Sequence, residues 1–67
     1  MITLTEQIAE AQRELALRRK LYPQWVKSGK LDMATAHAQL QAMAAIVTTL
    51  QRLEVEQRQL SLFLPAV

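Results

Sequence analysis

The sequence predicts an all-α protein, in the form of an antiparallel two-helix hairpin. Three observations predict this fold. Turn-forming residues are scarce, with one Gly and two Pro in 67 residues. Two long stretches carry apolar residues at spacings of three, four and seven, as helices do. The single Gly lies between these stretches, where a short connection is needed.

The first predicted helix covers about residues 4–28. Thr3 with Glu6 three residues later matches a capping box, which marks a helix start. The apolar stripe of this helix consists of Leu4, Ile8, Ala11, Leu15 and Tyr22. Arg18 falls on the same stripe, where its aliphatic stem packs or its guanidinium pairs with a carboxylate. Pro23 removes a backbone donor and predicts a kink within the helix.

A tight turn at 29–32 leads to a second helix, predicted over about 33–58. Gly29 suits the left-handed position after a helix, and Asp32 suits the N-cap of the next one. The apolar positions of the second helix are Met33, Ala36, Leu40, Met43, Ile46, Val47, Leu50 and Leu53. Because the two helices have similar lengths and a short connection, they form one hairpin domain over residues 1–58. Residues 59–67, which contain Pro65, are expected to form an extended C-terminal tail.

The second helix has more apolar surface than one neighbouring helix can cover. Ile46, Val47, Leu50 and Leu53 together occupy a wide arc of its circumference. Small helical scaffolds usually gain stability by association. We therefore expect a homodimer in which two hairpins form a four-helix bundle.

The composition argues against catalysis, metal binding and membrane insertion. Cysteine is absent, and the only histidine, His37, has no second ligand one helical turn away. Ser, Thr and carboxylate side chains form no nucleophile–base set, so we expect neither an enzyme nor a cofactor. The apolar runs are too short to span a bilayer and no signal peptide is visible, which favours a cytoplasmic protein without membrane contact.

A basic group lies towards the turn, in a chain of net charge +2. It consists of Arg18, Arg19, Lys20, Lys27 and Lys30. With Tyr22 and Trp25 between its members, the group suggests a nucleic-acid contact through phosphates and stacked bases. The simpler interpretation, which we favour, is a solvated helix surface with two aromatic side chains anchoring the turn.

The tail contains a recognisable peptide, Gln59, Leu60, Ser61, Leu62 and Phe63. At all five positions it resembles the motif by which bacterial proteins bind the sliding clamp, the DNA polymerase III beta subunit. The resemblance implies that Gln59 forms amide hydrogen bonds, that Ser61 faces solvent, and that Leu62 and Phe63 fill an apolar cleft. The competing interpretation is that Leu60 and Phe63 extend the apolar stripe of the second helix and pack in the core.

Residues 18–31, followed by an Ala-rich helix, also resemble small helical proteins encoded by phages and prophages. Together the resemblances imply a small phage-type interaction protein that docks on the clamp and regulates or blocks the access of other clamp users. The sequence leaves open whether docking inhibits or recruits. Two alternatives stand beside it: a basic helical dimer that binds nucleic acid, and a purely structural helical assembly protein.

Overall fold

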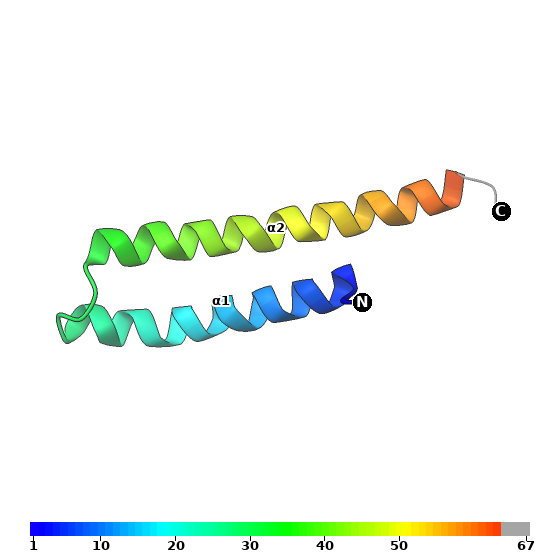
Figure 1. The fold of residues 1–67 in the computed structure, drawn as a ribbon. Helices are drawn as coiled ribbons and strands as arrows, with labels where there is room; N and C mark the ends of the chain where they lie inside the picture. The colour runs from blue at the N-terminus through cyan, green and yellow to red at the C-terminus, as the bar shows by residue number, and fades with distance from the viewer. Residues whose placement is uncertain (64–67) are drawn as a thin grey trace.

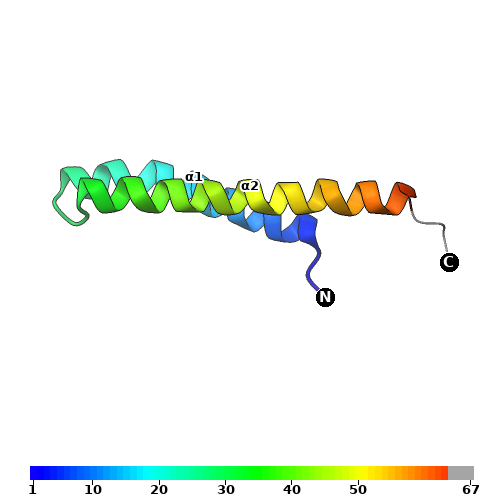
Figure 2. The ribbon, with the colours of Figure 1, turned by 90° about the horizontal axis from the view of Figure 1, so that it is seen from above.

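The computed structural model describes residues 1–63, which form two antiparallel helices (Figure 1). Helix α1 covers Leu4–Lys27 and helix α2 covers Met33–Phe63. The described residues contain no strand, so the all-α hairpin predicted from the sequence is confirmed. The molecule is a rod of 57 × 20 × 14 Å, and a second view shows the helices crossing at a shallow angle (Figure 2).

Helix α1 begins at the predicted capping box and passes through Pro23. The Thr3 hydroxyl accepts from the Glu6 backbone N–H at 3.1 Å, and the Glu6 carboxylate accepts from the Thr3 backbone N–H at 3.3 Å. Pro23 stays inside the helix, which ends at Lys27 with Ser28 as its C-cap. The predicted helix end at residue 28 is therefore accurate to one residue.

The turn between the helices is closed by backbone hydrogen bonds. Gly29 donates to the Val26 carbonyl at 3.1 Å and Lys30 donates to the Trp25 carbonyl at 2.8 Å, the two bonds of a Schellman motif. Gly29 has a φ of 81°, as its predicted left-handed role requires. Asp32 caps α2, since its carboxylate accepts from the Thr35 backbone N–H at 3.2 Å.

The core is a narrow seam between the two helices. Its centre consists of Ala11, Leu15, Met43 and Val47, with Leu40, Ala44 and Leu50 packed around it. Ile8, Tyr22 and Ala36 are buried at other points of the seam. Among the described residues, no side chain is less than 2% exposed. Three predicted stripe residues of α2 lie outside the core, namely Met33, Ile46 and Leu53.

The expected boundary between the second helix and an extended tail at residue 58 is wrong. Helix α2 continues through Phe63, so residues 59–63 are helical. The reason is local, because no proline or glycine lies between Met33 and Pro65, and proline disfavours helical dihedrals chiefly at the residue before it. The Ser61 hydroxyl also donates to the Gln57 carbonyl at 2.9 Å, one turn earlier in the helix. The rest of the predicted tail, residues 64–67, lies outside the described residues.

Candidate partner-docking site at the end of helix α2

The last turns of α2 project past the beginning of α1 (Figures 1 and 2). The Thr5 hydroxyl donates to the Glu54 carboxylate at 2.6 Å, and this is the hydrogen bond that ties the two helices together here. The Glu54 carboxylate also forms an ion pair with the Arg58 guanidinium at 2.9 Å, within α2. A shallow polar groove continues this contact as far as Ser61. Beyond that level, α2 stands without a neighbouring helix (Figure 1).

The apolar residues of the clamp-type motif are exposed at this projecting end. The exposed fraction is 58% for Leu60, 83% for Leu62 and 85% for Phe63. Gln59 and Ser61 are exposed as well. Within one chain, therefore, Leu60 and Phe63 do not extend the core.

The sequence of α2 explains why these side chains are exposed. The positions of α2 that face α1 follow a three–four spacing through Met43, Val47 and Leu50. The same spacing then reaches Glu54, Gln57 and Ser61, which are polar. The inward face thus changes from apolar to polar along the helix, and the apolar residues of the last turns point elsewhere.

One member of the basic group at the turn end is held in an ion pair, and the other four are exposed. The Arg18 guanidinium pairs with Glu14 at 2.9 Å, as one of the two sequence-based alternatives expected, and its side chain is only 29% exposed. Arg19, Lys20, Lys27 and Lys30 are exposed. Lys27 lies in the last turn of α1, where a cation favours the negative helix end.

The two aromatic residues near the basic group anchor the turn. Tyr22 is buried, and its hydroxyl donates to the Gln39 side chain at 2.9 Å. Its ring lies 5.6 Å from that of Trp25, centroid to centroid, in a tilted arrangement. A buried Tyr22 has no free face for a nucleic-acid base, which removes one of the two stacking groups on which the nucleic-acid interpretation depended.

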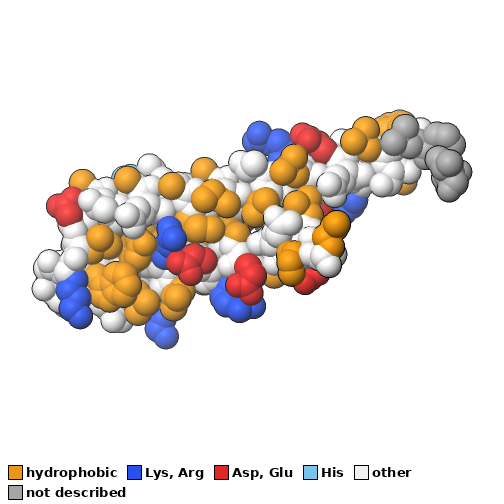
Figure 3. All heavy atoms as spheres, viewed as in Figure 1, with side chains coloured by type: hydrophobic (Ala, Val, Ile, Leu, Met, Phe, Trp, Pro, Cys, Tyr) orange, Lys and Arg blue, Asp and Glu red, His pale blue; other side chains and the backbone are white. Residues whose placement is uncertain are grey.

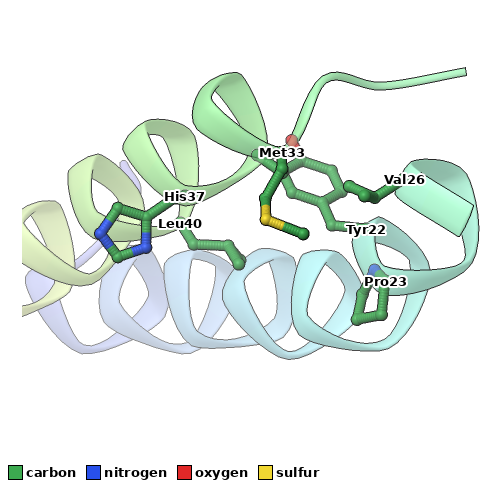
Figure 4. Close-up of a pocket in the computed structure, with 7 residues that line it drawn as sticks. Tyr22, Pro23, Val26, Met33, His37 and Leu40 are labelled. Carbon is green, nitrogen blue, oxygen red and sulfur yellow. The ribbon is translucent and has the colours of Figure 1, made fainter. Parts of the chain in front are cut away.

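An open apolar groove, not expected from the sequence, lies near the turn (Figure 4). The groove measures about 300 Å³ and is lined by Tyr22, Pro23, Val26, Met33, Ala36, His37 and Leu40. One indication of this groove was present in the sequence. Met33 is an apolar residue in the first turn of a helix, and it is 72% exposed. The walls are apolar apart from His37 and the Tyr22 hydroxyl, so the groove lacks a set of reacting groups.

Neither the rest of the described structure nor the comparisons with known proteins identify another candidate site. Among residues 1–63, no three His, Asp or Glu side chains gather closely enough to hold a metal ion. Neither α1 nor the described part of α2 has a stretch of sufficient length and hydrophobicity to cross a membrane. No family model matches the chain, and comparisons with curated proteins and with solved structures found no match.

Proposed function

We propose that this chain docks on the bacterial sliding clamp through residues 59–63 and regulates or blocks the access of other clamp users. The observation that carries the proposal is the coincidence of two features at one place. The five residues match the clamp-binding motif at every position. Their apolar side chains lie exposed on a helix end that projects beyond the hairpin (Figure 1).

The docking residues have the chemistry that an apolar cleft requires. In the bound peptide, Leu62 and Phe63 enter the cleft and Gln59 forms hydrogen bonds at its rim. Burial of each of these two apolar side chains contributes about 1.5–3 kcal/mol before ordering costs are subtracted. A single tail is therefore expected to bind with an affinity of roughly micromolar, about −8 kcal/mol.

Docking as an extended peptide requires the end of α2 to unwind. The cost is small, because the last turn of any helix lacks partners for its final carbonyls. Here the unwinding segment also lies beyond most contacts with α1, and Leu62 and Phe63 leave no core position when they move. The local opening of such a helix end costs much less than unfolding of the hairpin.

The functional consequence follows from occupancy of the cleft. A bound tail excludes any other protein that uses the same cleft, and no catalytic group is needed for this effect. The remainder of the chain, a rod 57 Å long, would extend from the clamp surface. Blocking is therefore the simplest activity of the docked chain.

The test is a titration of purified clamp with the wild-type chain and with the double variant Leu62→Ala/Phe63→Ala. We expect the double variant to bind about 100-fold more weakly, because two buried side chains are lost. The matched control is Met33→Ala/Val55→Ala, which removes two residues exposed by 72% and 47% outside the motif. Wild-type affinity in the control is expected. Absence of wild-type binding, or equal weakening in both double variants, would contradict the proposal.

A competition assay tests whether the chain occupies the cleft that other clamp users need. A labelled clamp-binding peptide is allowed to occupy the cleft, and the wild-type chain is added. Displacement of the peptide by the wild-type chain, but not by Leu62→Ala/Phe63→Ala, is expected for a blocker. Simultaneous binding of peptide and chain would show that the tail uses another surface.

A further inference from the structure

The isolated hairpin exposes more surface than a compact protein of its size. Its accessible surface is 5526 Å², whereas a compact monomer of 7.6 kDa exposes roughly 4,300 Å². Its radius of gyration is 16.4 Å, compared with about 11 Å for a compact 67-residue domain. The excess of about 1,200 Å² exceeds the roughly 800 Å² that each partner buries in a standard protein interface.

Three exposed apolar residues lie in one row along α2. Ile46, Leu53 and Leu60 are spaced seven residues apart, and their exposed fractions are 49%, 43% and 58%. Residues at this spacing lie on one side of a helix, where a second helix can cover them. We name these three residues the α2 seam. Figure 3 shows hydrophobic side chains exposed along both helices on the face in view.

The charges near the α2 seam favour a second copy of the chain as the covering partner. The seam region contains two basic residues, Arg52 and Arg58, and two acidic residues, Glu54 and Glu56. With this balance the seam has no attraction for a strongly acidic or strongly basic partner. A copy of the chain brings the same balance and the same apolar line, as a self-complementary two-fold interface requires.

Glu56 decides the orientation of the second copy. It follows Leu53 by three residues and precedes Leu60 by four, so it borders the α2 seam. A parallel pair in register would place Glu56 opposite its own copy, which is unfavourable. An antiparallel pair centred on Leu53 places Ile46 of one chain opposite Leu60 of the other and separates the two carboxylates.

From these observations we infer that a second copy of the chain covers the α2 seam in an antiparallel pair. Leu60 belongs both to this seam and to the clamp-type motif. Resting on the proposed function, the inference has a regulatory consequence: a chain cannot pair through Leu60 and extend the same residue along the clamp cleft. Self-association therefore keeps Leu60 helical and covered, and clamp docking requires the pair to separate at this residue.

The chain has no cysteine, so single-cysteine variants report the pairing directly. Leu53→Cys places a thiol at the centre of the seam, and Val55→Cys is the matched control. Val55 is 47% exposed, close to the 43% of Leu53, but lies two residues away on the opposite side of the helix. Under oxidation we expect Leu53→Cys to form a disulfide-linked dimer about tenfold faster than Val55→Cys. Equal rates would overturn the inferred interface, as would a wild-type chain that sediments as a monomer.

Mixed cysteine variants test the antiparallel orientation. Chains carrying Ile46→Cys and chains carrying Leu60→Cys are mixed and oxidised. Cross-links between the two kinds of chain are expected, since these positions face each other in an antiparallel pair. Cross-links confined to identical chains would instead show a parallel pair and overturn the orientation.

The regulatory consequence is tested with the oxidised and reduced forms of Leu53→Cys. Binding to purified clamp is expected to be about tenfold weaker for the oxidised dimer and to recover on reduction. Equal binding by both forms would refute mutual exclusion and leave the docking proposal intact. Absence of binding by both forms and by the wild-type chain would refute docking itself, while the cross-linking results would stand independently.

Discussion

The two ends of the hairpin differ in how their residues are held. At the turn end, backbone hydrogen bonds hold the turn against α1, Asp32 caps α2, and the Tyr22 hydroxyl donates to Gln39 across the two helices. At the other end, α2 runs on beyond α1, and Leu62 and Phe63 are more than four-fifths exposed. The described residues therefore combine a closed end with an open one.

This difference shows how a chain of 67 residues can keep one part for the stability of its fold and another part exposed to a partner. The core between the two helices, which contains Leu15, holds the hairpin together. The projecting end of α2 contributes little to this core, so it can change conformation without loss of the fold. Substitutions in the core and the turn are expected to alter the stability of the hairpin. Substitutions at the projecting end are expected to alter binding to the clamp.

The largest expected effect comes from Leu15→Ala, because Leu15 lies in the central cluster and is 8% exposed. Loss of its side chain leaves a cavity and is expected to cost about 2–5 kcal/mol of stability. Urea unfolding followed by circular dichroism, at a fixed chain concentration, measures the loss. Leu62→Ala is the control, since the same change at a residue 83% exposed is expected to leave stability unchanged. Similar losses in both variants would remove the contrast between the two ends.

A smaller effect is expected from Gly29→Ala at the closed end. Gly29 has a φ of 81°, and no atom lies within 4 Å of an added Cβ, so the cost arises from the backbone alone. We expect a loss of about 1 kcal/mol of stability. Gly29→Asn is the control, because asparagine tolerates the left-handed conformation and should lose less. Thermal unfolding provides the comparison, and an equal loss in both variants would show that tolerance of the left-handed conformation does not decide the cost.

The smallest expected effect concerns the helical state of the docking peptide. Ser61→Ala favours the helix, and Ser61→Asp disfavours it through the negative end of the helix dipole. Because docking requires an extended peptide, we expect clamp affinity to change by about twofold, weaker for Ala and tighter for Asp. Identical affinities for the two variants would indicate that the tail docks without unwinding.

Much of the fold could be predicted because its signals are local. The capping box at Thr3, the left-handed Gly29 and the Asp32 cap each depend on residues within one helical turn. Arg18 was undecided in the sequence, because packing and pairing both suited its position. In the structure its guanidinium pairs with Glu14, one turn earlier in the same helix.

The candidate site was recognised from its residues, but its conformation was not. Gln59 to Phe63 were expected to be extended because Pro65 follows them. Proline acts on the preceding residue and not on a whole segment, so the helix reaches Phe63. The groove around Met33 escaped prediction because its walls come from both helices.

By itself, the sequence determined two helices, the turn between them and the five residues of the candidate docking peptide. Each of these is specified by neighbouring residues, through backbone geometry, capping and apolar spacing. Only the tertiary structure decided which apolar residues are buried. Helix α1 covers one side of α2, and the beginning of α1 lies short of the end of α2. That coverage leaves Ile46, Leu53 and the docking peptide in contact with solvent, and it sets what a partner can reach.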